Sequence, residues 1–146
     1  MNPNRIRAAF VGVTLATLLV SGCGGSDTLS AKEFRSQANK LCTDANKDTE
    51  AYGAKITEAS SDADVTAAID KTVKRTSELV ADIDALEPPK DLADDVDSML
   101  ASVRAGNKDL DKVSSVQDLT SFDPNSGPFK EANDKASKLG LDACAD

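Results

Sequence analysis

Apolar residues recur in alternating steps of four and three along residues 34–113, as they do on one face of a helix. Three such series follow one another, the first interrupted near Asp48. They are Phe34, Ala38, Leu41, Ala45, Tyr52, Ile56 and Ala59; Val65, Ile69, Thr72, Thr76, Leu79, Ile83 and Leu86; and Leu92, Val96, Met99, Val103, Gly106, Leu110 and Val113. The pattern predicts three long helices, and its seven-residue repeat favours near-antiparallel packing at about 20°.

Polar residues and prolines mark where these helices begin and end. Ser30 and Glu33 have the spacing of a capping box, and Ser60-Ser61-Asp62 predicts the start of the second helix. Pro88-Pro89 predicts its end, because a residue before proline is driven out of the helical region. We expect Pro89 to lie in the first turn of the third helix, where proline is tolerated.

A short fourth helix is predicted to begin at Ser126-Gly127-Pro128. Gly140 stands where a left-handed cap would end it, and Leu141 could then fold back onto the helix. The apolar residues of this helix are Phe129, Ala132, Ala136 and Leu139. No strand-like alternation of useful length occurs, so the predicted fold is an all-α, up-and-down bundle of three long helices and one short C-terminal helix over residues 30–146.

Two features of this bundle have more than one interpretation. Gly106 lies on the apolar face of the third helix, where it either opens a notch for a small ligand or lets a neighbouring helix or a large side chain such as Tyr52 approach closely. The connection 114–125 is long for a bundle. Val116, Leu119 and Phe122 within it predict a short helical turn packed over the bundle end, and a binding loop is the alternative.

The first 22 residues have the order of regions found in an export signal. Arg5 and Arg7 supply the positive start, and the apolar run Ala8–Val20 follows before small residues. A membrane-spanning helix is the competing interpretation, but it needs about 17–25 apolar residues and this run has 13. We therefore predict a signal peptide over residues 1–22.

The end of this signal, Val20-Ser21-Gly22-Cys23, resembles the lipobox of bacterial lipoproteins. The resemblance implies that Cys23 is joined through sulfur to a diacylglycerol and becomes the mature N-terminus on the extracytoplasmic face of the cell membrane. Multiple acyl chains anchor a protein stably, whereas one does so marginally. Residues 23–29 are then a lipidated flexible tether reaching about 15 Å. A secreted protein without lipid is the alternative.

The chain has three cysteines, so lipidation of Cys23 leaves Cys42 and Cys144 as a pair. In an oxidising compartment such a pair usually forms a disulfide. An up-and-down bundle brings the end of the fourth helix near the start of the first, which suits this bridge. Closing a loop of about 100 residues is worth roughly 4–5 kcal/mol in the chain-entropy model.

The charge of the chain limits its partners. The whole chain carries −8, and residues 23–146 carry −10 because Arg5 and Arg7 fall in the predicted signal. An acidic domain repels phosphate backbones and anionic lipid headgroups. We therefore expect no nucleic-acid partner. We also expect the lipid on Cys23, rather than the protein surface, to attach the protein to the membrane.

The residues available for chemistry favour a non-catalytic protein without a cofactor or a metal. Histidine, the usual general base, does not occur in the sequence, and no motif marks another catalytic pair. Asp91, Asp94, Asp95 and Asp97 could bind a hard cation, but acids in a first helical turn also complement the helix dipole. Asp123–Gly127 lacks the turning glycine and closing glutamate of a calcium loop.

Three segments together are similar to a type of small lipoprotein or secreted protein of actinobacteria. They are "FRSQANKLC" at 34–42, "LEPPKDL" at 86–92 and "FKEANDKASKLGLDAC" at 129–144. Such proteins share an early F-x-x-x-A-N-x-x-C, a central L-x-P-P and a terminal L-G-L-x-x-C. The resemblance implies an extracytoplasmic location and a Cys42–Cys144 disulfide, but no particular activity.

These observations predict a lipid-anchored binding or interaction module of the cell envelope, with an envelope protein as a possible partner. Two alternatives remain at this point. One is a solute-binding accessory lipoprotein, and the other is a structural or spacer protein of the envelope.

Overall fold

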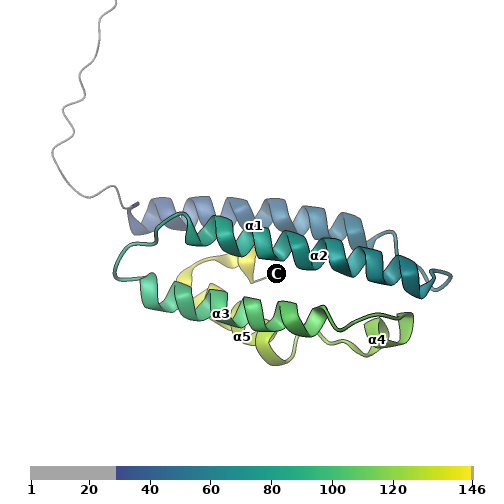
Figure 1. The fold of residues 1–146 in the computed structure, drawn as a ribbon. Coiled ribbons are helices and arrows are strands. Elements are labelled where there is room, and N and C mark those ends of the chain that lie inside the picture. The colour runs from purple at the N-terminus through teal and green to yellow at the C-terminus, as the bar shows by residue number, and fades with distance from the viewer. Residues whose placement is uncertain (1–28, 146) are drawn as a thin grey trace, which may run out of the picture.

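The computed structural model describes residues 29–145, and within them the chain is helical with no strand. The elements are α1 (Ala31–Gly53), α2 (Asp62–Asp84), α3 (Ala93–Leu110), α4 (Val116–Ser121), α5 (Gly127–Leu139) and the 3₁₀ helix η1 (Asp142–Cys144). Two antiparallel pairs, α1 with α2 and α3 with α5, lie side by side along one axis (Figure 1). The predicted all-α bundle with a disulfide is confirmed.

Helix α1 begins as predicted but ends early. The Ser30 side chain accepts a hydrogen bond from the Glu33 amide, and the Glu33 carboxylate accepts one from the Ser30 amide, which completes the capping box. The helix ends at Gly53, so the prediction that Ile56 and Ala59 continue it is wrong. Glycine is a weak helix former, and the turns after Gly53 direct Ile56 onto the bundle end instead.

Helix α2 begins as predicted, but the connection from its end to α3 is longer than predicted. Ser61 and Asp64 form a second capping box at the start of α2. Helix α2 ends at Asp84, and Glu87 just before the prolines has a φ of 51°, which takes the chain out of the helix. Pro89 lies in a turn before α3 rather than in its first turn, because α3 begins only at Ala93.

The C-terminal part of the chain follows the predicted plan. Helix α5 begins at Gly127 with Pro128 in its first turn and ends at Leu139, and the following Gly140, with a φ of 73°, gives the expected left-handed cap. Leu141 is fully buried, as expected of an apolar residue folding back after such a cap. Helix α4 is the predicted short helical turn, and its residues Val116 and Leu119 pack at the bundle end.

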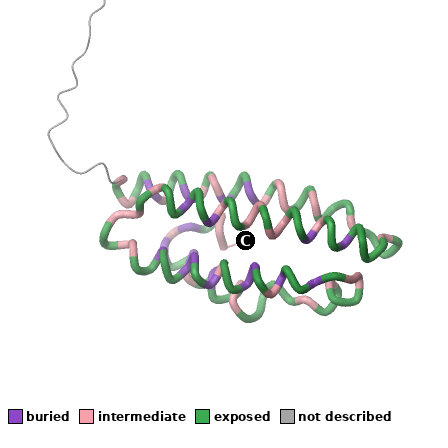
Figure 2. Tube along the Cα trace, in the orientation of Figure 1, coloured by how far each residue is buried: buried purple, intermediate pink, exposed green. Residues whose placement is uncertain are grey.

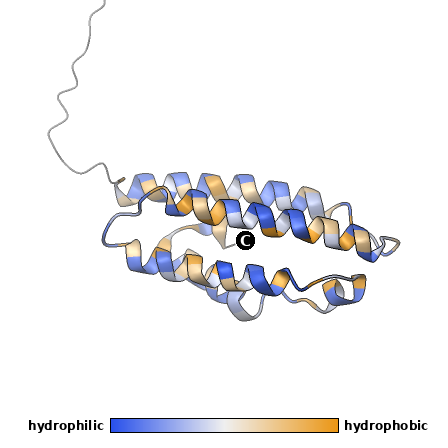
Figure 3. Cartoon of the chain, in the orientation of Figure 1, coloured by the Kyte–Doolittle hydropathy of each residue, from blue (hydrophilic) through white to orange (hydrophobic). Residues whose placement is uncertain are grey.

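Buried positions recur along the inward-facing sides of the helices (Figure 2), and most of the buried hydrophobic residues belong to two clusters. The large core cluster contains Phe34, Ala38, Cys42, Val80, Ile83, Val96, Met99, Leu100, Ala136, Leu139 and Leu141. The small core cluster contains Val65, Ile69, Leu110 and Val113, and half-buried Ile56, Phe122 and Phe129 pack against it. Apolar positions face the interior while the outer faces are largely hydrophilic (Figure 3).

The predicted disulfide joins Cys42 of α1 to Cys144 of η1. It holds the C-terminal segment between the two helix pairs, where the chain end lies in Figure 1. The predicted signal peptide, the lipidation residue Cys23 and most of the tether lie outside the described residues. Among the residues that are described, no helix combines the length and the apolar character needed to cross a bilayer.

Candidate binding cavity

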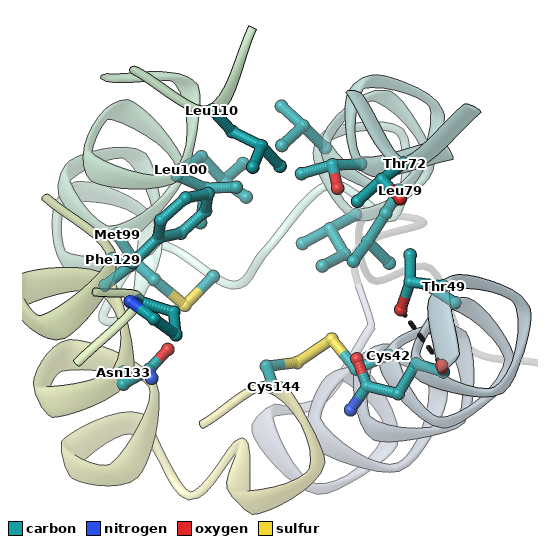
Figure 4. Close-up of a pocket in the computed structure, with 18 of the residues that line it drawn as sticks. Cys42, Thr49, Thr72, Leu79, Met99, Leu100, Leu110, Phe129, Asn133 and Cys144 are labelled. Atoms are coloured by element: carbon teal, nitrogen blue, oxygen red, sulfur yellow. Dashed lines mark hydrogen bonds between the residues drawn. A yellow bond between two sulfur atoms is a disulfide. The ribbon is translucent and has the colours of Figure 1, made fainter. Parts of the chain in front are cut away.

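A cavity of about 310 Å³, partly open to solvent, lies among the helices between the two core clusters (Figure 4). Helices α1, α2, α3 and α5 all line it, as do η1 and the loop before α5. Its apolar lining comes from Cys42, Ala45, Leu79, Val80, Ile83, Met99, Leu100, Val103, Leu110, Phe122, Pro124, Phe129, Ala132 and Cys144. The volume falls at the lower end of the roughly 300–1,000 Å³ of ligand pockets, and spaces between bundle helices are a common place for them.

The cavity exists because one side of the bundle is closed by η1 instead of by direct helix packing. Helix α1 packs on α2, α2 on α3, and α3 on α5, whereas η1 packs against both α1 and α5. Asparagines of α1 hold this segment in place. The Asn39 side chain donates to the Gly140 carbonyl (3.1 Å) and accepts from the Ala143 amide (2.9 Å), and Asn46 donates to the Ala143 carbonyl (2.8 Å).

Neutral polar side chains line part of the cavity: Asn46, Thr49, Thr72, Thr76 and Asn133. The Thr49 hydroxyl donates to the Asn46 carbonyl oxygen at 2.9 Å, and the Thr72 hydroxyl donates to the Ala68 carbonyl oxygen at 3.0 Å. Figure 4 shows Thr49 and Thr72 on the α1–α2 side, across the cavity from Met99 and Phe129. The cavity therefore combines an apolar lining with a few fixed hydrogen-bonding groups.

None of the residues lining the cavity is charged. Arg75 follows the lining residue Thr72 by one helical turn, but its Nε donates to Asp48 Oδ2 at 2.9 Å. This ion pair joins α1 to α2, and the Arg75 side chain is only 16% exposed. Because Asp48 already compensates the guanidinium, the cavity has no free cation to attract an acidic ligand.

Phe129 and Phe122 form one wall of the cavity. Their rings meet edge to face with centroids 6.2 Å apart. Phe129 lies directly over Gly106, where an added Cβ would stand 2.8 Å from the ring. The large side chain predicted to approach this glycine is thus present, but it is Phe129 and not Tyr52. Both aromatic residues also border a second, outer hollow of about 270 Å³ next to Gly106.

The acidic candidates from the sequence do not come together into a site. Asp94 and Asp95 lie in the first turn of α3, and Asp91 precedes the helix. Within residues 29–145, no three acidic, cysteine or histidine side chains are placed to hold one metal ion. Asp123 instead accepts a hydrogen bond from the Asn125 amide, an Asx turn that shapes the loop before α5.

The acids with altered pKa values serve helix caps or surface ion pairs. Hydrogen bonds from Ser30, Ser61 and Ser115 lower the pKa of Glu33, Asp64 and Asp118 respectively, at the starts of α1, α2 and α4. A hydrogen bond from Lys130 lowers the pKa of Asp134. All four carboxylates are exposed and away from the cavity, so their altered pKa values indicate structural roles.

The helical spacing predicts Thr72 and Thr76 as core positions and does not indicate the cavity. The only indication of the cavity in the sequence is that these two polar residues occupy inward-facing positions of α2, where a fully apolar core would have aliphatic residues. The chain matches no protein-family model, and it has no significant match among curated proteins or solved structures.

Proposed function

We propose that this protein is a non-catalytic, lipid-anchored binding protein of the cell envelope, whose central cavity takes a small, uncharged and largely apolar molecule. The cavity carries the proposal, because it has apolar walls, no charged lining residue and a few convergent polar groups. Among the functions expected from the sequence, this is the solute-binding one. The uncharged lining narrows the class of solute to neutral molecules, whereas the sequence alone gives no class of solute.

The N-terminal motif supports the proposed location. Val20-Ser21-Gly22-Cys23 follows a signal of suitable length, and a lipid on Cys23 would hold the acidic domain at the outer face of the membrane. Leu29, the first described residue, packs against the large core cluster. Lipidation would thus tether the bundle by that end through residues 23–29.

Filling the cavity tests the binding role. Ala132 lies on the cavity wall and is buried, so Ala132→Leu places a larger side chain inside it. We expect toluene or 1-hexanol to raise the melting temperature of the full-length protein, because a ligand that binds only the folded state stabilises it. Ala132→Leu should remove this rise, whereas Ala105→Leu on the exposed face of α3 should keep it. If neither probe raises the melting temperature, the binding role is wrong.

Removing the acceptor of the lipid tests the anchor. We expect Cys23→Ser to release the protein into the medium or to leave unprocessed precursor, with the mass of the diacylglycerol lost from intact-protein mass spectra. Normal processing and membrane retention of the variant would contradict lipidation. Because this test does not involve the cavity, its result is independent of the binding test.

A further inference from the structure

The lining of the cavity changes in character along the bundle axis. At one end it consists of apolar members of the large core cluster, among them Cys42, Ile83 and Met99. Thr49 follows Cys42 by seven residues, and Thr76 precedes Ile83 by the same number, which is about 10 Å along a helix. The Asp48–Arg75 ion pair places these parts of α1 and α2 side by side. A ligand that fills the cavity thus meets threonine hydroxyls on the α1–α2 side near the small core cluster, opposite the apolar Leu110 and Phe129, and only apolar groups at the end formed by the large core cluster.

Two of the four polar side chains on the α1–α2 side, Thr49 and Thr72, can act only as acceptors toward a ligand. The hydroxyl protons of Thr49 and Thr72 are used in hydrogen bonds to backbone carbonyls, and a hydroxyl that donates its proton can then only accept. The Asn46 side-chain nitrogen donates one of its two protons to the Ala143 carbonyl and keeps the other. The groups that can only accept are therefore Thr49 and Thr72. A ligand group placed here gains most if it brings a proton to donate. Asn133 on α5 adds an amide that can donate to the same ligand group.

A carboxylate is poorly suited to this position. Its oxygens would gain nothing from the Thr49 and Thr72 hydroxyls, and although the neutral Asn133 amide could donate to them, the cavity offers no cation to compensate the charge. Burying an unpaired charge is far more costly than burying a neutral hydroxyl that is hydrogen-bonded. The same reasoning disfavours phosphate and sulfate esters.

We infer that the ligand is a neutral alcohol with a hydrocarbon chain. Its hydroxyl lies at Thr49 and Thr72, and its chain runs toward Met99 and the Cys42–Cys144 disulfide. The volume of about 310 Å³ is roughly twice that of an engineered cavity that holds benzene, which suits a chain of medium length. This inference rests on the proposed binding function and adds the chemical class and orientation of the ligand.

Three probes of matched size separate the possibilities: 1-hexanol, its isomer 1-methoxypentane, which has no donor, and hexanoate. Affinities are measured at pH 7 from amide NMR shifts of the full-length protein in mild detergent. The Ala132→Leu variant is titrated in the same solution to correct for partition into micelles. We expect 1-hexanol to bind about fivefold to tenfold more tightly than the ether, the effect of one hydrogen bond. Hexanoate should bind at least about tenfold more weakly than 1-hexanol.

Removal of the acceptors tests the orientation. The Thr49→Val/Thr72→Val variant keeps the shape of the cavity, and we expect it to lower affinity for 1-hexanol about fivefold to tenfold while leaving the ether unchanged. Thr43→Val is the matched control, because the Thr43 hydroxyl donates to the Asn39 carbonyl in the same way but on the exposed face of α1.

Each result has a distinct meaning. Equal binding of 1-hexanol and the ether, with hexanoate weaker, would overturn the alcohol inference and leave the proposed binding function standing. Binding of hexanoate as tight as that of 1-hexanol, or tighter, would also contradict the proposed preference for an uncharged molecule. Equal loss of 1-hexanol and ether affinity in the double valine variant would overturn the assigned orientation. The absence of binding by every probe would overturn the binding function itself.

Discussion

The two core clusters of the bundle differ in how completely they are packed. In the large core cluster, Phe34, Met99, Leu100 and Leu141 are almost completely buried, and the Cys42–Cys144 disulfide crosses the cluster. In the small core cluster only four residues are buried, and the aromatic residues packed against them remain half-exposed. The cavity lies where one kind of packing gives way to the other.

This difference indicates how a small bundle can contain both a densely packed core and a cavity. Protein interiors are normally packed as densely as organic crystals, so a cavity forfeits packing interactions along its walls. The large core cluster and the disulfide supply stability on one side, which lets the helices around Thr72 and Phe129 stay apart. Four predictions test this division, beginning with the largest expected effect.

Removing the disulfide should have the largest effect on the large core cluster. The bond spans 102 residues of sequence, and opening so long a loop costs about 4–5 kcal/mol in the chain-entropy model. We expect Cys42→Ala/Cys144→Ala to lower the free energy of unfolding in urea by about that amount. A loss below about 1 kcal/mol would show that packing alone holds η1 between the helix pairs.

Truncating a phenylalanine of the large core cluster, and one that packs against the small core cluster, compares the packing of the two clusters directly. Phe34 is completely buried, so Phe34→Ala should cost about 3–5 kcal/mol. Phe122 is only half-buried, and Phe122→Ala should cost at most about 2 kcal/mol. Both values come from the same urea titrations. Equal costs would mean that the two clusters contribute alike, contrary to the division described here.

A methyl group added at Gly106 should disturb the aromatic wall of the cavity. The new Cβ would meet the Phe129 ring at 2.8 Å, so we expect Gly106→Ala to destabilise the protein by about 1–3 kcal/mol despite the better helix propensity of alanine. Gly53→Ala is the control, because nothing lies within 4 Å of the Cβ it would add. That variant should be neutral or slightly stabilising, and equal effects at the two glycines would show that Phe129 moves freely.

The smallest effect expected is the acid sensitivity of the helix starts. Hydrogen bonds from Ser30 and Ser61 lower the pKa of Glu33 and Asp64 in the folded state. Their contribution to stability is therefore complete above the ordinary carboxyl pKa of about 4 and is lost as the pH falls through the lower folded-state values. Ser61→Ala should flatten this pH dependence of the unfolding free energy, whereas Ser36→Ala on the exposed face of α1 should not. An unchanged pH profile in both variants would contradict a role for the caps.

Local signals were sufficient to predict most of the fold. The caps at Ser30 and Ser61, the left-handed Gly140 and the disulfide each depend on a few neighbouring residues or on bundle topology. The errors arose where tertiary contacts decide where a residue packs. Ile56 continues the apolar spacing of α1, yet it packs at the bundle end after Gly53 stops the helix.

The cavity could not be predicted in the same way. Its existence depends on how far apart α1 and α5 are held by η1, which no periodicity encodes. Gly106 did indicate a close approach, but only the structure identifies Phe129 as the residue that makes it. The threonines of α2 fit a helical core position as well as a cavity wall, so their sequence spacing alone does not separate the two.

The most direct test of the account is to measure nuclear Overhauser contacts between 1-hexanol and methyl groups of the full-length protein. We predict contacts from the Thr72 methyl to the protons beside the hydroxyl, and from the Met99 and Leu100 methyls to the far end of the chain. Val65 is as buried as Met99 and Leu100 but does not line the cavity, so its methyl groups should show no contact with 1-hexanol. Contacts confined to exposed methyls, or seen equally at Val65, would contradict a binding site between the two clusters.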